Sequence, residues 1–410
     1  MKEPKIRFKG FSGEWKRSTL GDLALFSKGS GYSKSDICKE GTPVILYGRM
    51  YTKYQSVFDE IDTFVNPKDN SVVSKGGEVI IPGSGESSED ISLAAMVKNE
   101  GVILGGDLNI LKFNQKVNDP AFMSMAITYS PTRAELSSYS QGKTVVHLRN
   151  SEIAKGTIRY PDILEQNTIV NYVLSLDAQI SASTSRLASL KQMKAASLQA
   201  MFPQEGETVP KVRFKGFEGE WKKVKLNTFA KRIMRKNSNL ESSLALTIAS
   251  AYGLVSQAEY FNNLVVGSNI QNYYLLKKGE FAYNKSYSNG YPFGSVKRLD
   301  RYEQGILSTL YIVFSIDNSV SSDYITHFFD TTLWHKEIAE RAEEGARNHG
   351  LLNIATRDFF DIYIWMPDSV KEQQSIASFF TSLDRQIALH TQRLEKLKQI
   401  KAACLDKMFV

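Results

Sequence analysis

Cysteine is nearly absent from this chain of 410 residues, which contains only Cys38 and Cys404. The two stand far apart in unlike sequence surroundings, so we expect neither a disulfide framework nor a cysteine-ligated zinc cluster. Long apolar runs are also missing: the N-terminus lacks the apolar core of a signal peptide, and no stretch approaches the roughly 18 apolar residues that span a bilayer. The sequence therefore predicts a cytoplasmic protein without membrane association.

The motifs of several enzyme classes are missing as well. No two prolines are adjacent, which excludes the Asp/Asn-Pro-Pro-aromatic loop that holds adenine in amino-methyltransferases. Gly142-Lys143-Thr144 resembles the end of a phosphate-binding loop, but Ser137 stands where that motif requires glycine. The five histidines show no metal-ligand spacing. We therefore predict no catalytic residue, no cofactor and no metal ion.

The chain does have an excess of positive charge and the composition of a folded protein. Lysine and arginine number 51 against 44 aspartates and glutamates, which gives a net charge of +7. Such a balance favours a polyanionic partner, DNA or RNA, without requiring one. The length exceeds what one hydrophobic core usually fills, so two domains are expected.

An internal repeat organises the whole sequence. Residues 4–24 read PKIRFKGFSGEWKRSTLGDLA, and residues 210–230 read PKVRFKGFEGEWKKVKLNTFA. A second pair of segments, each with Glu-Gln near its start and Met-Phe at its end, repeats at almost the same offset. Between these ends, residues 25–149 and 231–355 differ. Because a duplicated enzyme would be expected to repeat its catalytic motif, we predict two modules with a common frame and different reading surfaces.

The second pair of repeated segments carries apolar residues at a seven-residue period, as in the a and d positions of a coiled coil. Neither contains proline or glycine between Glu165 and Phe202 or between Lys371 and Phe409, so each can form one helix of roughly 57 Å. Antiparallel packing of these helices would give a pseudo-twofold arrangement; the alternative is that each helix lies along its own domain. The predicted seam residues are Ile169, Leu176, Ile180, Leu187, Leu190, Ile376, Leu383, Ile387, Leu394 and Leu397.

Polar residues interrupt the predicted seam. Ser183 and His390 fall in the middle of the a column, and Lys194 and Lys401 fall near the ends of the d column. Polar residues at such positions weaken a coiled coil but fix its register. We therefore expect a weak seam with one preferred alignment, and we interpret His390 as an ordinary packed or solvated residue.

Together, the duplicated opening P-[IV]-R-F-x-G-F-x-G-E-W and the E-Q-x-x-I…L-D-x-x-I entry to a long helix ending in Met-Phe carry a family resemblance. They resemble the framework of the specificity subunits of bacterial Type I restriction-modification enzymes, and the resemblance covers the full chain. It implies an α+β fold with two target-recognition domains joined by two long helices, packed as an antiparallel coiled coil.

The resemblance also implies a function and a set of partners. Each domain would read one half of a bipartite, asymmetric target in double-stranded DNA. Two modification subunits, adenine-N6 methyltransferases that use S-adenosylmethionine, and restriction subunits would carry the chemistry, so this chain would itself be non-catalytic. A freestanding coiled-coil architectural DNA-binding protein, or an adaptor without enzyme partners, remains the alternative.

The repeat and the linker after the first helix set the expected boundaries. The segment 204–209 is polar and is flanked by Pro203 and Pro210, as expected of a linker. The predicted domains are residues 1–157 for the first target-recognition domain, 158–203 for the first long helix, 204–209 for the linker, 210–363 for the second target-recognition domain, and 364–410 for the second long helix.

DNA reading requires cations for phosphates, and amides, hydroxyls or guanidinium groups for base edges, presented on loops. Loops of this composition are residues 47–54, 84–88 and 138–143 in the first domain, and residues 231–236, 284–289 and 347–349 in the second. The clearest is the loop at 284–289, which follows the apparent strand Gly279–Tyr283, although a solvated hairpin turn would have a similar composition. Each cation proposed here could equally be an ordinary surface residue. The predicted contact residues are Arg49, Lys53, Ser84, Ser87, Lys143, Arg232, Arg235, Asn284, Lys285, Tyr287, Asn289 and Arg347.

Other residues are assigned to the framework. Trp15 and Trp221 occur in both repeats, so they cannot encode different half-sites, and we predict that they pack in the core. Short strands are expected at residues 78–81, 110–113 and 311–314, beside a few helices.

Overall fold

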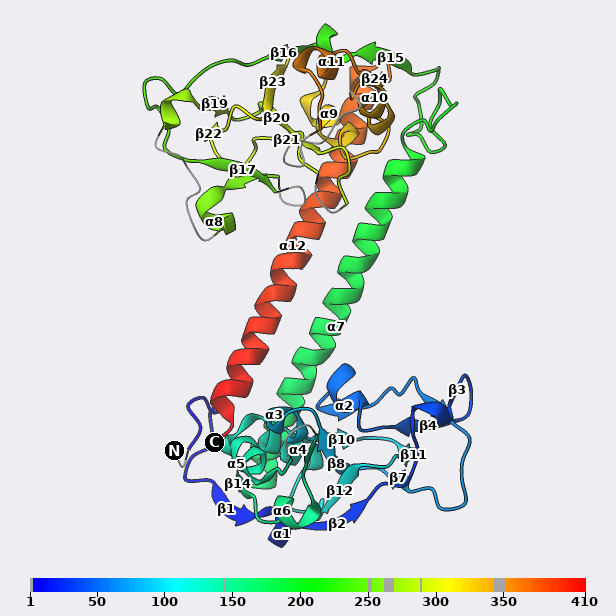
Figure 1. The fold of residues 1–410 in the computed structure, drawn as a ribbon, viewed down its shortest axis with the longest axis vertical. Helices are drawn as coiled ribbons and strands as arrows, with labels where there is room; N and C mark the ends of the chain where they lie inside the picture. Colours follow the sequence, from blue (N-terminus) through cyan, green and yellow to red (C-terminus); the bar gives the residue numbers. More distant parts are fainter. Residues whose placement is uncertain (1–2, 143–144, 250–252, 262–268, 288–289, 343–351) are drawn as a thin grey trace. The chain divides into compact units, whose positions relative to one another are not determined.

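The two repeated tails form the long helices that the sequence predicts. In the computed structural model, α7 spans Ile163–Ala200 and α12 spans Val370–Met408 (Figure 1). Each begins just after a Pro-Asp pair, and Pro203 follows α7, because proline is tolerated at a helix start but cannot continue a helix. Among the described residues, no helix is both long and apolar enough to cross a membrane.

The chain divides into two units. The structure describes residues 3–142, 145–249, 253–261, 269–287, 290–342 and 352–410. Unit 1 comprises Met1–Thr184 and Gln392–Val410, and unit 2 comprises Ser185–Thr391. Each unit therefore contains one of the two differing middle segments together with part of both long helices. The domain boundaries expected from the sequence stay a prediction.

In each unit, the core takes residues from both long helices. Ile169 and Leu176 of α7 share the hydrophobic core of unit 1 with Leu397 of α12. In unit 2, Phe202, which follows α7, shares the core with Phe380 of α12. The start of α7 thus lies with the end of α12, and the end of α7 with the start of α12, which is antiparallel packing. The alternative in which each helix lies along its own domain is wrong.

The predicted seam positions lie at the interior side of this helix pair. Two of them, Ile180 and Ile387, are half-buried in the structure. It buries the other eight: Ile169, Leu176, Leu187, Leu190, Ile376, Leu383, Leu394 and Leu397.

The two seam lysines find acidic partners on the opposite helix. The Lys194 ammonium lies 2.7 Å from the Asp384 carboxylate in unit 2. In unit 1, Lys401 forms an ion pair with Asp177. Lys194 corresponds to Lys401 in the repeat, and Asp384 corresponds to Asp177. The same lysine–aspartate ion pair therefore joins the two helices in each unit. This reciprocity is what a twofold arrangement produces, and it offsets the weakening expected from the sequence.

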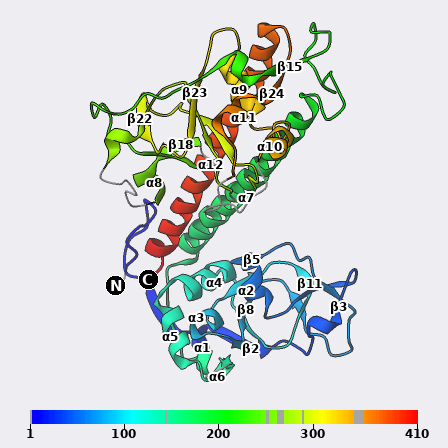
Figure 2. The same ribbon diagram turned by 45° about the horizontal axis from the view of Figure 1, so that its top comes forward.

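Unit 1 is built around a five-stranded sheet of order β2-β12-β8-β10-β5. Its central strand β8 (Glu78–Pro82) is buried throughout, and β12 is Leu108–Phe113. In Figure 2, helices α3, α4 and α5 gather to one side of β8. The other sheet strands are β2 (Ala24–Lys28), β10 (Ala95–Val97) and β5 (Val57–Phe58); the helices are α3 (Ser88–Ile91), α4 (Pro120–Tyr129) and α5 (Pro131–Tyr139).

A second five-stranded sheet and short elements complete unit 1. That sheet has the order β3-β6-β4-β11-β7. The elements are β1 (Lys16–Thr19), α1 (Leu20–Leu23), η1 (Lys34–Asp36), β3 (Ile37–Cys38), β4 (Thr42–Ile45), α2 (Arg49–Thr52), β6 (Phe64–Val65), β7 (Val73–Lys75), β9 (Ser84–Gly85), β11 (Glu100–Leu104), β13 (Val146–His147), α6 (Asn150–Ile153) and β14 (Thr157–Tyr160).

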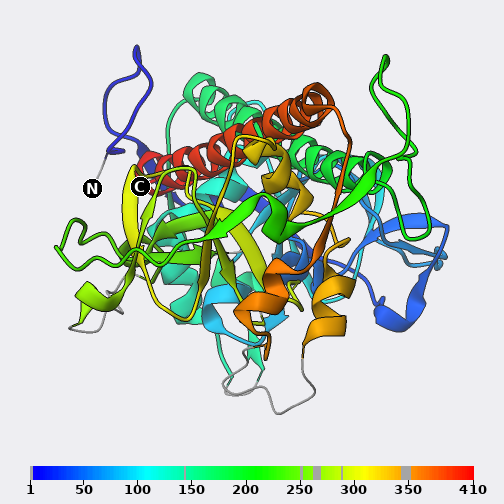
Figure 3. The same ribbon diagram turned by 90° about the horizontal axis from the view of Figure 1, so that it is seen from above.

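Unit 2 repeats the core of this plan with a sheet of order β16-β23-β20-β21. Strand β20 (Phe281–Asn284) takes the place of β8, and β23 (Ile312–Ile316) takes that of β12. Figure 3 shows the gold and orange helices α9, α10 and α11 beside the yellow-green strands of this unit. The three strands expected from the sequence are thereby confirmed as β8, β12 and β23.

The other elements of unit 2 include two strand pairs, β17-β18 and β19-β22. The elements are β15 (Lys222–Lys225), η2 (Leu226–Thr228), β16 (Ala230–Arg232), β17 (Leu246–Ala249), β18 (Gly253–Ser256), α8 (Gln257–Phe261), η3 (Ile270–Asn272), β19 (Tyr274–Lys277), β21 (Ser295–Arg298), β22 (Gln304–Leu307), α9 (Ser322–Phe328), α10 (His335–Arg341), α11 (Thr356–Phe360) and β24 (Tyr363–Met366).

The duplicated opening forms the same contacts in both units. Arg7 Nε lies 2.7 Å from Glu165 at the start of α7, and Arg213 Nε lies 2.6 Å from Glu372 at the start of α12. Strand β1 pairs with β14 as β15 pairs with β24. The repeated sequence therefore builds a repeated frame.

The repeated tryptophans belong to that frame. Trp15 is 3% exposed and Trp221 is 2% exposed, each within the hydrophobic core of its unit. The Trp221 ring packs edge-on against Phe202, with 5.9 Å between the ring centroids. The predicted packing role of both residues is confirmed.

The frame also ties each helix end to the chain segment beside it. The Ile6 amide donates a 3.1 Å hydrogen bond to the Lys407 carbonyl near the end of α12. The Val212 amide donates a 2.8 Å bond to the Ala200 carbonyl at the end of α7. The N-terminal segment thus docks on α12 as the segment after the linker docks on α7.

Candidate nucleic-acid interface

Two polar segments of unit 1 meet at the end of the central strand β8. Residues 83–85 leave this strand, and the described residues 141–142 and 145–149 lie beside it after α5. The Leu148 amide donates a 3.0 Å hydrogen bond to the Gly83 carbonyl. His147 lies opposite Ser84 in the short antiparallel pair of β13 and β9. We call these two joined stretches the strand-end segment and the return segment.

Polar side chains on β12 and in the turn before it hold the two segments in place. Asn109 on β12 is fully buried, and its side-chain amide donates to the Leu148 carbonyl at 2.8 Å and to the Pro82 carbonyl at 3.3 Å. Ser84 Oγ donates to Asp107 at 2.9 Å. Asp107 has a φ of 57°, a left-handed conformation that costs energy in a residue with a side chain. The turn before β12 is therefore shaped to support the strand-end segment.

The third predicted loop of the first domain reaches the same place. Tyr51 on α2 donates its hydroxyl hydrogen to the Ser84 carbonyl at 2.8 Å. Burial raises the pKa of Tyr51, so the hydroxyl stays a donor at neutral pH. A Cβ on Gly85 would lie 2.8 Å from the Tyr51 hydroxyl, so a side chain there would push the loops apart. The structure thus brings together the three loops at residues 47–54, 84–88 and 138–143.

A matching contact occurs at the end of β20 in unit 2. The Leu352 amide donates a 3.0 Å hydrogen bond to the Lys285 carbonyl, which matches the bond from Leu148 to Gly83. Asn284 accepts a 3.0 Å hydrogen bond from the Ser286 amide, which shapes the loop that follows the strand. The predicted loop at 284–289 is therefore the counterpart of the strand-end segment in unit 1.

Three of the predicted contact residues, Lys143, Asn289 and Arg347, lie outside the described residues. In the sequence, Lys143 and Arg347 stand the same number of positions before Leu148 and Leu352. The two cations therefore stand at corresponding sequence positions of the two repeats.

The predicted loop at 231–236 lies elsewhere in unit 2. Arg232 is opposite Phe314 in the sheet, and Phe314 is opposite Phe281, the first residue of β20. Asn284 is the last residue of β20, so the two loops are at opposite ends of that strand. Arg235 donates to the Leu275 carbonyl at 3.1 Å and to Glu280 at 2.6 Å, whereas Arg232 is exposed.

These observations can be set against known proteins. The sequence profile described as "Type I restriction modification DNA specificity domain" matches residues 12–192 and 218–399. The chain belongs to this family. The two matched regions are the two repeats, so the chain is a Type I restriction-modification specificity subunit with a duplicated specificity domain.

Solved structures resemble this specificity subunit over nearly its whole length. The S subunit of a Type I restriction-modification system from M. genitalium has a TM-score of 0.63 at 14% identity, covering 100% of this chain and 99% of that chain. The HsdS subunit from Thermoanaerobacter tengcongensis has 16% identity, a TM-score of 0.45 and 96% coverage of both chains. A chain from work on complex assembly and conformational transition of the type I R-M system has 14% identity, a TM-score of 0.47, and coverage of 96% and 97%. Curated protein sequences gave no match.

Several predicted contact residues of the specificity subunit already have partners within the protein. Arg49, whose side chain is 9% exposed, forms an ion pair with Asp62 and lies over the Phe58 ring. Lys53 pairs with the same carboxylate, and hydrogen bonds from these two cations hold the pKa of Asp62 well below its usual range. A DNA contact by Arg49 would require this pair to open.

The remaining predicted residues differ in how available they are. The hydroxyl of Ser84 is buried and bonded to Asp107, and Ser87 caps α3 by accepting a 3.1 Å hydrogen bond from the Asp90 amide. Lys285 is half-buried, and its ammonium has no ion-pair partner within the part of the chain that the structure describes. The Tyr287 ring is 55% exposed.

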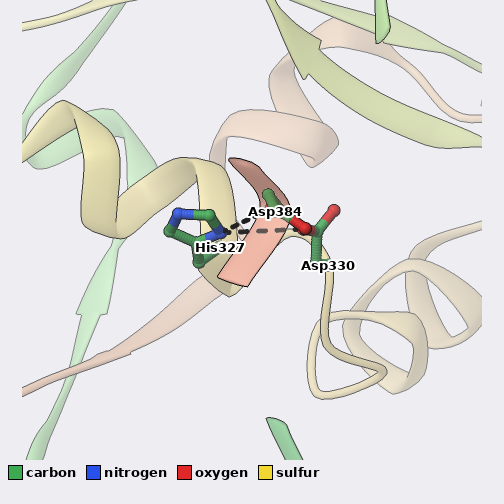
Figure 4. A group of neighbouring side chains, drawn as sticks. All are labelled: His327, Asp330 and Asp384. Atoms are coloured by element: carbon green, nitrogen blue, oxygen red, sulfur yellow. Dashed lines mark ion pairs between the residues drawn. The ribbon is translucent and has the colours of Figure 1, made fainter. Parts of the chain in front are cut away.

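Unit 2 also contains a buried cluster of charged groups in which His327, Asp330 and Asp384 converge (Figure 4). The His327 Nδ1 atom lies 3.7 Å from Asp330 and 3.8 Å from Asp384. Histidine and carboxylate side chains are common ligands of transition metals. Here, however, Lys194 lies 2.9 Å and Lys297 lies 2.8 Å from Asp330. The carboxylates are thus neutralised by ammonium groups, and a divalent cation would be repelled by both lysines.

We interpret this cluster as an ion-pair network that connects α7, α12, β21 and the end of α9. Burial alone would raise the pKa of Asp330, but the neighbouring Lys297, His327 and Lys194 outweigh it and hold that pKa well below its ordinary value. Thr381 contacts the other ring nitrogen of His327 at 3.1 Å.

Proposed function

We propose that this specificity subunit recognises a bipartite, asymmetric sequence in double-stranded DNA, with one half read by each unit. One observation carries the proposal: at the end of β8 in unit 1 and of β20 in unit 2, the same backbone hydrogen bond joins the residue after the strand to a later segment, yet the described residues beside the two bonds differ. A shared frame with different exposed side chains is what two readers of unlike half-sites require.

The proposal includes a division of labour with partner proteins. Adenine-N6 methyltransferase subunits and restriction subunits would dock on the chain and carry methyl transfer and DNA cleavage, while the chain itself would be non-catalytic. The net charge of +7 supports binding to a polyanion.

Co-expression with a candidate modification subunit tests this function directly. We expect a stable complex that methylates adenine at one split sequence, which methylation-sensitive sequencing of the host genome would reveal together with its spacer. Failure to form a complex, combined with no adenine methylation at a split sequence, would contradict the proposal. Sequence-specific DNA binding by the chain without any such complex would indicate the freestanding architectural protein instead.

Lys285→Ala provides a residue-level prediction. If Lys285 contacts a base, its loss should weaken DNA binding by about 1–3 kcal/mol and relax specificity at one position; if it contacts a phosphate, the salt slope should fall by about one. Binding isotherms across a salt series distinguish the two outcomes. Lys277→Ala, which removes an exposed lysine of the same unit, is the matched control. If neither the affinity nor the salt slope changes, Lys285 is a surface cation that does not contact DNA.

A further inference from the structure

A polar hollow of about 220 Å³ opens beside the return segment of unit 1. It is lined by Gln141, Gly142, His147, Arg149 and Glu152. The backbones of Gln141 and His147 exchange two hydrogen bonds, of 2.8 Å and 3.0 Å. Side chains of residues that are directly opposed in an antiparallel pair project from the same face. Gln141 and His147 therefore stand side by side at the hollow.

The side chains at this hollow are available for binding. Gln141, His147 and Arg149 are exposed. Within the described part of the chain, their side chains form no ion pair and no hydrogen bond with another residue, whereas Arg49 and Ser84 are both committed to internal partners. Glu152 is the exception in the hollow, because it accepts a 3.0 Å hydrogen bond from the Arg149 amide.

The backbone that carries these side chains is held from two sides. His147 is paired with Ser84 on the strand-end segment. Leu148, between His147 and Arg149, donates to the Gly83 carbonyl and accepts from the buried Asn109 amide. A preorganised reading surface loses little conformational entropy on binding, so its hydrogen bonds contribute more of their energy to affinity.

We propose that Gln141, His147 and Arg149 read base edges in the major groove of the half-site that unit 1 recognises. An arginine guanidinium can donate two parallel hydrogen bonds to O6 and N7 of guanine, and a glutamine amide can bond to N6 and N7 of adenine. A histidine ring supplies one further donor or acceptor. This inference rests on the proposed function. It assigns base recognition in unit 1 to the return segment instead of to Arg49.

The chemistry of this set also separates it from a phosphate-binding patch. Phosphate oxygens only accept hydrogen bonds and so need donors alone, whereas here an amide and an imidazole offer acceptors as well as donors beside the one cation. Mixed donors and acceptors match the pattern on base edges, which carries the sequence information.

The test uses the full chain in complex with its modification subunit and selects preferred targets from a DNA library with both half-sites randomised. Arg149→Ala should relax one position of one half-site, with a loss of about 5- to 150-fold for the preferred base. Gln141→Ala should relax a neighbouring position of the same half-site. Arg149→Lys keeps the charge but loses the forked geometry, so it should relax the same position as Arg149→Ala.

Lys155→Ala is the matched control, because Lys155 is an exposed cation a few residues further along the chain. It should leave the base preferences unchanged. In every variant, an unchanged preference at the other half-site shows that the complex is folded and competent.

Three results would overturn the inference: unchanged base preferences in all of the Arg149 and Gln141 variants, an equal loss of affinity for every sequence, or relaxation of both half-sites together. A wild-type complex that selects no sequence at all would instead overturn the proposed function. The two failures are therefore distinguishable.

Discussion

Replacing residues 25–149 by residues 231–355 should make the recognised target symmetric, with two copies of the half-site that unit 2 now reads. The reason is that the frame is shared while the reading segments belong to the exchanged part. Each mismatched base pair costs about 1–3 kcal/mol, so a half-site with three mismatches should lose affinity by roughly a hundredfold or more. Selection from a library with randomised half-sites and spacers measures the outcome.

The packing partners needed by the transplanted segment exist in unit 1. Phe202, which packs against Tyr324 and Phe328 in unit 2, has Phe409 as its counterpart. Asp330 and Lys297 would travel with the segment, and Lys401 and Asp177 would replace Lys194 and Asp384, so the ion-pair network could form again.

The reverse exchange is the control for this chimera, because it should give the other symmetric target. A chimera that folds, binds DNA and still selects the asymmetric wild-type sequence would show that residues 25–149 do not carry the specificity of the first half-site.

Asp330→Asn should destabilise unit 2 by about 3–5 kcal/mol at neutral pH, because it leaves two half-buried lysines without the counterion that they share. The Asp330 side chain is only 15% exposed, so solvent screening is weak. Its pKa in the folded protein lies well below the ordinary value of 3.8. A depressed pKa means that the carboxylate stabilises the fold above that ordinary value and loses this effect as the pH falls toward the folded pKa.

Denaturant unfolding followed at several pH values measures this effect. The difference in the free energy of unfolding between wild type and Asp330→Asn should be constant from neutral pH to about pH 5, and should shrink below about pH 4. Glu205→Gln is the control, because Glu205 forms an exposed ion pair with Lys336. A difference below about 1 kcal/mol, or one that is the same at acidic and neutral pH, would contradict the role given to the network.

The sequence was sufficient to predict the frame because its signals are local. The absence of proline and glycine and the seven-residue period specify a long helix whatever surrounds it, and the repeated Trp15 and Trp221 indicate a core position in each half. The two loops at 84–88 and 284–289, which we propose to read DNA, were selected by composition alone. Their equivalence is visible only in the structure, where β8 and β20 occupy the same position in the sheets of the two units.

What the sequence did not reveal depends on partners that are distant along the chain. The Met-Phe pair that follows the first long helix is apolar, but nothing in its spacing indicates that Phe202 enters the core of unit 2. Lys194 looks like a weak seam residue until Asp330 in a non-repeated segment meets it. In the sequence, Arg49 looks like a free cation. Its ion pair with Asp62 forms only because the loop between the two residues folds back.

The bond between Ile6 and Lys407 has a consequence for how the protein is made. The core of unit 1 includes Leu405, Met408 and Phe409, so this core cannot close until the end of α12 has been translated. Unit 2 has no such delay, since Met201 and Phe202 are already present when its own strands emerge. Folding during synthesis usually completes the N-terminal domain first. In this protein the order of completion is set by the ends of the two long helices, and the core of unit 1 depends on residues that are translated after unit 2.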